Sequence, residues 1–150
     1  MRILGVNVKA DVAYLAVAED GGILSLEPGV LKLPTGVEES RRLIVFQDEV
    51  SRLLENFSIS KVCVLEPETN YSATYKAFLT RITIETVIMA AAAGYGARRL
   101  SRARCRSLLD LPKSGTLKNH VSSITAPVGP AWTDKRDLAA LAALACEKDG

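Results

Sequence analysis

The first twenty residues constrain the fold most strongly, because they carry two strand patterns in succession. Residues 2–9 alternate between two faces, with Ile3, Gly5 and Asn7 on one side and Leu4, Val6 and Val8 on the other. This is the period of a strand in a sheet. A second β-rich run over 12–19 leads into "EDGG", which suits a tight reversal of the chain. The chain therefore begins as an antiparallel hairpin, with the polar amide of Asn7 on one face of its first strand.

Helical and strand patterns then alternate along the rest of the chain. The predicted elements, in chain order, are a third antiparallel strand over 23–33, a helix over 35–57, a buried strand over 61–65, a helix over about 72–93, a strand over 96–100, a short helix capped by Ser101, and a last helix that begins at Thr133 or Asp134. This order predicts one α/β domain over 1–150. Its mixed sheet has five strands, three antiparallel and then parallel ones, and is flanked by helices.

Composition excludes some classes of protein. With 48% apolar and 24% charged residues the sequence is typical of a compact globular domain, and its net charge of +2 indicates no partner by itself. No apolar run approaches the roughly 20 residues of a membrane span, and the start is too short for a signal peptide. The three cysteines are widely spaced and lack metal-ligand spacing, which predicts reduced thiols and favours the cytoplasm.

Three carboxylates lie where predicted elements begin or end. Glu66 follows the buried strand 61–65, and Asp134 and Asp137 lie in the first turn of the last helix. Each has an ordinary structural interpretation. Glu66 suits a solvated strand end, and acids in a first helical turn cap the helix or complement its dipole. Singly, none of them indicates a function.

Together, these features form a pattern. The chain resembles the ribonuclease-H-like superfamily and, within it, the RuvC-type Holliday junction resolvases. "ILGVNVKADVAYLAVAEDG" resembles the opening hairpin of that family, "VCVLEPE" its glutamate-bearing strand, and "DKRDLAALAALA" its closing D-x-x-D helix. "LSRARCRSLL" followed by "SGTLKNHV" is similar to the connecting segment, in which Lys118 would be the basic residue after a glycine-containing turn.

The resemblance implies a metal-dependent phosphodiesterase, an endonuclease acting on structured nucleic acid, DNA rather than RNA. Glu66, Asp134 and Asp137 would hold Mg²⁺ or Mn²⁺, since hard oxygen ligands suit these ions and two of them stabilise the attacking and leaving oxygens. Lys118 would assist them. A homodimer is also implied, because a four-way junction has two-fold symmetry. An ATP-binding sugar-kinase or actin-like relative is disfavoured, because such proteins need two related domains.

Asn7 departs from the family pattern, which has aspartate at this place as a catalytic residue shared by both metals. An amide coordinates through one neutral oxygen and cannot bridge two metals with two anionic oxygens. Two functional hypotheses follow: an endonuclease with a weakened or single-metal site, and a catalytically inactive binding or scaffold protein. A third interpretation is structural, with the amide of Asn7 forming a hydrogen bond within the fold.

Five arginines lie within nine residues. They are Arg98, Arg99, Arg102, Arg104 and Arg106. Such a cluster suits phosphate and predicts a nucleic-acid-binding surface, whereas the alternative is a solvated helix face with ion pairs to Glu38, Glu39 or Asp110. The single histidine, His120, lies in a polar segment that is expected to form loops or another short helix; a flexible loop is favoured for it, and a helper role in proton transfer is the alternative. Neither a phosphate-binding glycine-rich loop nor a Ser-His-Asp arrangement occurs.

Overall fold

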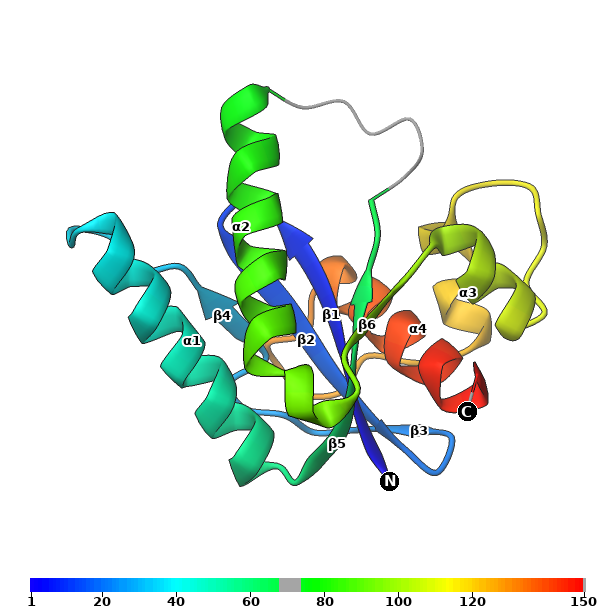
Figure 1. Ribbon diagram of the computed structural model, residues 1–150. Helices are drawn as coiled ribbons and strands as arrows, with labels where there is room; N and C mark the ends of the chain where they lie inside the picture. Colours follow the sequence, from blue (N-terminus) through cyan, green and yellow to red (C-terminus); the bar gives the residue numbers. More distant parts are fainter. Residues whose placement is uncertain (68–73, 150) are drawn as a thin grey trace.

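The computed structural model describes residues 1–67 and 74–149. Within them one mixed sheet contains six strands in the order β3-β2-β1-β5-β6, with β4 also paired to β2 (Figure 1). The strands are β1 (Arg2–Lys9), β2 (Val12–Glu19), β3 (Gly22–Leu24), β4 (Val30–Lys32), β5 (Ile59–Leu65) and β6 (Arg98–Leu100). β1 and β2 are antiparallel, whereas β1, β5 and β6 run parallel to one another. The mixed α/β architecture predicted from the sequence is confirmed.

The predicted third strand is divided into two, so the prediction of five strands was wrong by one. β3 and β4 each pair with β2, at its end and at its beginning. The chain between them leaves the ladder: Leu26 turns into the core, where it is 2% exposed. Pro28 has no N–H to donate to a strand neighbour. A proline and a buried leucine thus interrupt what the apolar pattern suggested was a single strand.

Helices cover both faces of the sheet (Figure 1). They are α1 (Glu39–Asn56), α2 (Tyr75–Ala91), α3 (Arg102–Leu108) and α4 (Asp134–Asp149), with short 3₁₀ helices η1 (Ala93–Tyr95) and η2 (Leu117–Ser123). Ser101 caps α3 as predicted, its hydroxyl accepting from the Arg104 N–H at 3.0 Å. Thr74 caps α2 in the same way, and Ser72, where that helix was expected to begin, lies outside the described residues. None of the described helices is long and apolar enough to cross a membrane.

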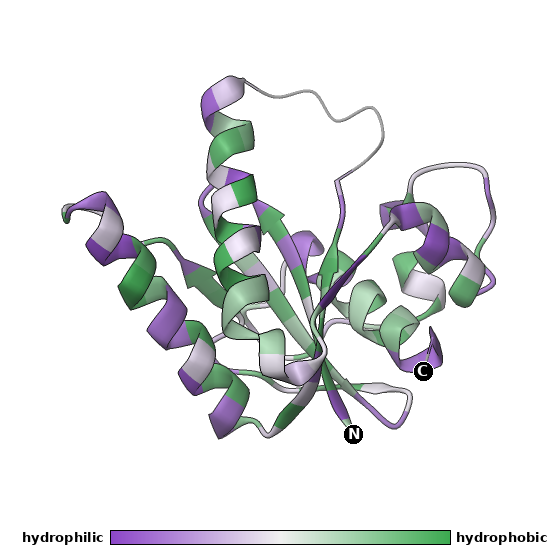
Figure 2. Cartoon of the chain, viewed as in Figure 1, coloured by the Kyte–Doolittle hydropathy of each residue, from purple (hydrophilic) through white to green (hydrophobic). Residues whose placement is uncertain are grey.

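The two faces have separate hydrophobic cores. On one face α1 and α2 pack against side chains of β1, β2 and β5, with Phe46 and Ile84 fully buried. On the other face α4 and α3 pack against the sheet, and this core contains all three cysteines, which are free and buried. In Figure 2, hydrophobic and hydrophilic residues alternate along α1, whereas most of α2 is coloured as hydrophobic. The alternation along β1 therefore divides its side chains between two different cores.

The α4 helix lies unusually close to β1. A Cβ placed on Gly5 would lie 1.9 Å from the carbonyl oxygen of Ala139 and 2.7 Å from the backbone nitrogen of Ala143. Only glycine allows this approach, and small side chains on the facing side of α4 match it. Ala139, Ala142 and Ala143 are all fully buried. This contact brings the first turn of α4 to the end of β1, where Asn7 lies.

Candidate functional site

Asn7 is buried at the carboxyl end of β1 and is bonded to α4. Its side chain is 4% exposed, and Nδ2 donates to the carbonyl oxygen of Lys135 at 3.0 Å. Because β1 and β5 are parallel and in register, their carboxyl ends lie side by side. The amide therefore joins the strand end to the first turn of α4. An ionised carboxylate at this position has no hydrogen to donate to the Lys135 carbonyl.

Asp134 and Lys118 form an ion pair at the beginning of α4. The Nζ of Lys118 lies 2.6 Å from Asp134 Oδ2, and the Nζ of Lys135 lies 3.8 Å from the other carboxylate oxygen. The hydrogen bond from Lys118 lowers the pKa of Asp134, and the same bond raises the pKa of Lys118. The charge of Asp137 raises the pKa of Lys118 a little further, so the two aspartates and the lysine share one electrostatic environment.

Asp137 is held by an indole. Trp132 Nε1 donates to Asp137 Oδ1 at 2.5 Å, and the guanidinium of Arg136 lies over the Trp132 ring, 4.5 Å from its centre. Arg136 is 2% exposed and donates to the carbonyl oxygen of Leu15 on β2 at 2.9 Å. The sequence analysis did not single out Trp132 or Arg136. The sequence offered one indication of this contact: its single tryptophan lies five residues before Asp137, close to where the last helix begins.

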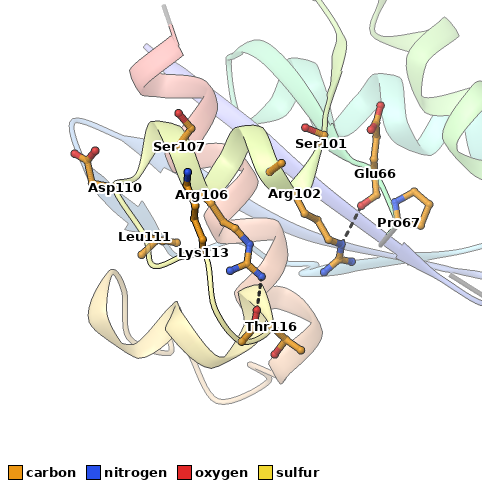
Figure 3. A pocket seen from close by; sticks show the side chains of 12 residues that line it. Glu66, Pro67, Ser101, Arg102, Arg106, Ser107, Asp110, Leu111, Lys113 and Thr116 are labelled. Atoms are coloured by element: carbon orange, nitrogen blue, oxygen red, sulfur yellow. Dashed lines mark hydrogen bonds between the residues drawn. The ribbon is translucent and has the colours of Figure 1, made fainter. Parts of the chain in front are cut away.

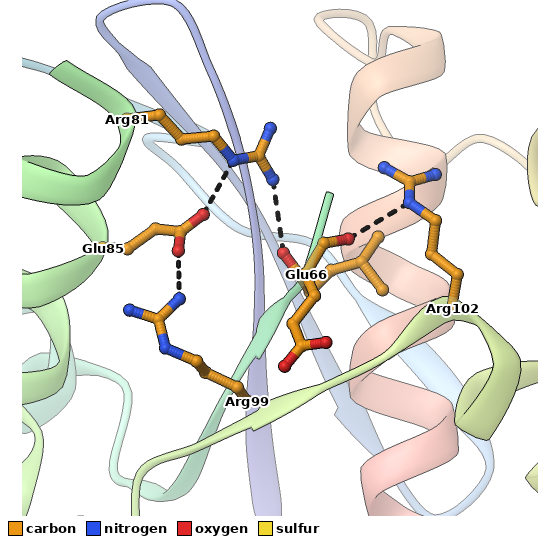
Figure 4. Close-up of polar contacts among 6 residues, drawn as sticks. Glu66, Arg81, Glu85, Arg99 and Arg102 are labelled. Atoms are coloured by element: carbon orange, nitrogen blue, oxygen red, sulfur yellow. Dashed lines mark hydrogen bonds and ion pairs between the residues drawn. The ribbon is translucent and has the colours of Figure 1, made fainter. Parts of the chain in front are cut away.

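Glu66 lies at the end of β5, where its backbone N–H and its backbone carbonyl both form hydrogen bonds. Its N–H donates to the Leu100 carbonyl at 2.8 Å, and its own carbonyl accepts from Arg102 Nε at 3.1 Å. The preceding carbonyl, that of Leu65, accepts from Arg81 at 3.4 Å. Two guanidinium groups thus bond consecutive carbonyl oxygens, while the Glu66 carboxylate points away from both of them (Figure 4). Backbone bonds to two other elements therefore fix the end of β5.

These side chains do not fit a two-metal centre. Such a centre needs several carboxylates facing one point. Among residues 1–67 and 74–149, no group of three or more His, Cys, Asp or Glu side chains is arranged to hold a metal ion. Asp134 instead faces the ammonium of Lys118, Asp137 faces an indole N–H, and Asn7 directs its N–H groups to a carbonyl. The predicted roles of Glu66, Asp134, Asp137 and Lys118 in catalysis or metal binding therefore stay predictions.

Three of the five clustered arginines form ion pairs within the protein. Arg98 and Arg104 each lie 2.7 Å from a carboxylate oxygen of Asp149, and Arg99 is paired with the buried Glu85. The ion pairs predicted from the sequence involved other acids. Asp149 and Glu85 were not predicted as partners, because Asp149 is 45 residues from Arg104 and Glu85 lies within an apolar helical stretch. A nucleic-acid-binding role for these three arginines stays a prediction.

Glu85 is the centre of a buried ion cluster. It is 2% exposed, and it accepts from Arg81 Nε at 2.8 Å as well as from Arg99 (Figure 4). The cluster ties α2 to β6 and, through the bond from Arg81 to Leu65, to the end of β5. The sequence indicates this cluster only through the spacing of Arg81 and Glu85, which lie four residues apart in a largely apolar helical stretch. That spacing predicts an ion pair but does not predict burial.

Arg102 and Arg106 lie elsewhere, on the wall of a groove of about 670 Å³. The groove runs between the end of β5, α3 and the segment 110–116 (Figure 3). Arg106 donates to the carbonyl oxygens of Pro112 at 2.8 Å and of Gly115 at 2.7 Å. Lys113 also lines the groove, although the sequence analysis did not select it. The two acids of the lining, Glu66 and Asp110, lie at opposite ends in Figure 3, with Arg106 and Lys113 between them.

His120 bonds the segment 110–116, which lines this groove. It lies in η2 rather than in the flexible loop that was expected, and its Nε2 is 2.8 Å from the Ser114 carbonyl oxygen. Gly115, which follows Ser114 in the chain, has φ +77°, a conformation that favours glycine. Hydrogen bonds from the side chains of Arg106 and His120 to backbone carbonyls thus hold the segment 110–116.

Comparisons with known proteins agree on the fold. No model of a protein family matches the sequence, and no curated protein matches it. Among solved structures, Thermus thermophilus RuvC in complex with Holliday junction substrate superposes with a TM-score of 0.74 at 16% identity, over 99% of this chain and 93% of that one. A second Thermus thermophilus RuvC structure gives 0.75 at 17% identity, over 99% and 94%. The yeast mitochondrial Holliday junction resolvase Ydc2 gives 0.63 at 12% identity, over 97% and 77%.

These likenesses extend over nearly the whole chain. Together with the strand order described above, they show that the protein has the ribonuclease-H-like fold of the RuvC-type resolvases. The predicted fold class is confirmed. At identities of 12–17%, the comparisons establish the fold alone.

Proposed function

We propose that this protein binds branched DNA and that its acidic residues do not carry out two-metal hydrolysis. Support for DNA as the partner comes from the likeness, over 99% of the chain, to a RuvC solved with a Holliday junction substrate. The basic groove beside β5 offers a surface that can contact a phosphate backbone. The protein then belongs to the second of the two functional classes suggested by the sequence, a binding or scaffold protein on a nuclease fold.

The observation that carries this proposal is the hydrogen bond from Asn7 to Lys135. At about 4 Å, a carboxylate gains on the order of 4 kcal/mol from each unit of positive charge at an effective dielectric near 20, whereas an amide offers only a dipole. Here the amide also has a structural task, because it links β1 to α4. A residue that donates to a carbonyl inside the fold is poorly suited to receive two dications.

A second candidate function is a metal-dependent endonuclease with a retuned site. Its support is the shared environment of Lys118, Asp134 and Asp137 next to Asn7, where the resemblance predicts catalytic groups. Glu66, Asp134 and Asp137 would then hold Mg²⁺ or Mn²⁺. Carboxylate oxygens supply the hard donors that either ion prefers. For this to occur, Asp134 would have to exchange the ammonium of Lys118 for the metal.

One experiment separates the two candidates. A four-way DNA junction and a linear duplex of the same sequence are incubated with the protein in EDTA and in Mn²⁺, and both binding and cleavage are measured. We expect binding that favours the junction in both buffers, with the DNA left intact. Mn²⁺-dependent cleavage that disappears in both Glu66→Gln and Asp137→Asn would establish the endonuclease instead. Failure to bind the junction in either buffer would refute both.

We also propose that the protein forms a homodimer through α2. Four large apolar side chains follow one stripe of this helix at helical spacing, and they are all exposed: Tyr75 at 80%, Phe78 at 45%, Leu79 at 50% and Ile82 at 40%. A second copy of the same surface would cover this stripe, and a two-fold dimer matches the symmetry of a four-way junction. Sedimentation should show a dimer that Phe78→Glu dissociates and Val30→Glu, on β4, does not. A monomeric wild type would refute this.

A further inference from the structure

We propose that the groove between α3 and the segment 110–116 holds the DNA phosphate backbone, and that Arg106 and Lys113 are its principal cations. This inference rests on the proposed DNA binding and makes it more specific. It also differs from the prediction that the whole arginine cluster binds nucleic acid, because it centres on Arg106, leaves Arg102 on the same groove wall as a lesser contact, and adds a lysine from outside the cluster.

The charges of the arginine cluster favour Arg106. Arg98 and Arg104 share the carboxylate of Asp149, and Arg99 faces Glu85, so each of these guanidinium groups is already directed to a carboxylate of the protein. Arg106 bonds two carbonyl oxygens, which carry no net charge. Its guanidinium therefore keeps its full positive charge on the groove wall, and this charge is available to a phosphate.

The geometry of Arg106 is also fixed in advance. Two hydrogen bonds, at 2.8 Å to the Pro112 carbonyl and 2.7 Å to the Gly115 carbonyl, hold both guanidinium NH₂ groups. A long side chain normally loses rotamer freedom when it binds, at a cost of about 0.5–1.5 kcal/mol. Here much of that freedom is lost on folding. The same bonds hold the segment that carries Lys113, so the two cations keep a constant relation to each other.

The remaining lining points to a backbone ligand rather than to bases. Within the described part of the chain the groove contributes the hydroxyls of Ser101, Ser107 and Thr116, which can donate to phosphate oxygens, and no aromatic ring. Base recognition in single strands depends largely on aromatic stacking. Contacts made only to phosphates position a nucleic acid without reading its sequence. We therefore expect the groove to select the course of the backbone at a junction and not the order of the bases.

The test uses salt-dependent binding to a four-way junction. Each lost phosphate contact lowers the slope of log K against log salt by about 0.9. Arg106→Ala with Lys113→Ala should therefore reduce the slope by about 1.8 and weaken binding at least tenfold at low salt, equally for two junctions of different sequence. Lys32→Ala, which removes a charge from β4, is the matched control and should change neither quantity. Arg104→Ala should change the affinity less than twofold.

A further variant and thermal melts distinguish a loss of DNA binding from a loss of folding. Because Arg106 holds two backbone carbonyls, Arg106→Ala can loosen segment 110–116, and Lys113→Glu alone then provides the decisive measurement. Thermal melts identify any variant that is unfolded. Wild-type affinity and slope in Lys113→Glu and in the double variant would overturn the groove assignment while leaving the proposed DNA binding intact. An equal loss in Arg104→Ala would overturn it in favour of the whole arginine cluster. A wild type that does not bind the junction would overturn both proposals.

Discussion

Asn7→Asp is the most informative single substitution, because it tests the structural role of the amide directly. It removes the hydrogen bond to Lys135, which contributes about 1 kcal/mol, and places a buried carboxylate against a carbonyl oxygen, which costs roughly a further 1–3 kcal/mol. The positive end of α4 offsets about 1 kcal/mol of this. We expect a metal-free protein that is less stable by about 2 kcal/mol.

The loss should depend on pH in a defined direction. Burial raises the pKa of the new carboxyl group above the usual value for aspartate, because it disfavours the charged form. The deficit is therefore complete above this raised pKa. It shrinks as the pH falls towards the ordinary value near 3.9, where the neutral acid can itself donate to the Lys135 carbonyl.

Urea denaturation at about pH 8 and about pH 5, each compared with wild type, measures both effects. Asn7→Ala is the control, since it loses the same bond without gaining a charge, and its deficit should be independent of pH. Repeating the series in Mn²⁺ tests the site: the added carboxylate should recover part of its deficit, and wild type should gain nothing. If Asn7→Asp matches wild type at pH 8 without metal, Asn7 is not the link between β1 and α4.

Three further outcomes follow from the packing and the charges. Gly5→Ala should destabilise the protein by about 3 kcal/mol or more in urea denaturation, because the new methyl group meets the backbone of α4. Glu85→Gln should cost about 3 kcal/mol in the same assay, because it removes the carboxylate that lies between two guanidinium groups. The hydrogen bond from Arg104 lowers the pKa of Asp149, so its stabilising effect is complete above about pH 3.9 and is lost as the pH falls through the lower folded value. Thermal melts of Asp149→Asn should accordingly differ from wild type at neutral pH and converge with it in acid.

Much of the fold could be predicted from local patterns. Alternation identified β1 and β2, helical spacing identified α1, and Ser101 marked the start of α3. The division between β3 and β4 could not be seen in the same way. Leu26 continues an apolar pattern, but its side chain enters the core and its backbone leaves the sheet, which is decided by tertiary packing.

The site was only partly predictable for a related reason. The strand pattern drew attention to Asn7, but the partner of its amide is a backbone carbonyl 128 residues away. Because every residue has a backbone carbonyl, the sequence could not indicate which one Asn7 would bond. The ion pairs of three clustered arginines likewise depend on Asp149, which is 45 residues from Arg104, and on a glutamate within an apolar helix. Residue type indicates what a side chain can bind. The fold determines which partner it finds.

The contact between Gly5 and α4 also has a consequence for motion. The backbone of α4 lies so close to Gly5 that sliding or tilting the helix towards β1 would bring Ala139 and Ala143 into collision with the strand, so we expect α4 to stay fixed relative to β1. The segment 110–116 is different: six of its seven residues are exposed, and hydrogen bonds to Arg106 and His120 hold it in place. If the protein binds a DNA junction as proposed, we expect it to adjust in the segment 110–116, with β1 and α4 as the fixed reference.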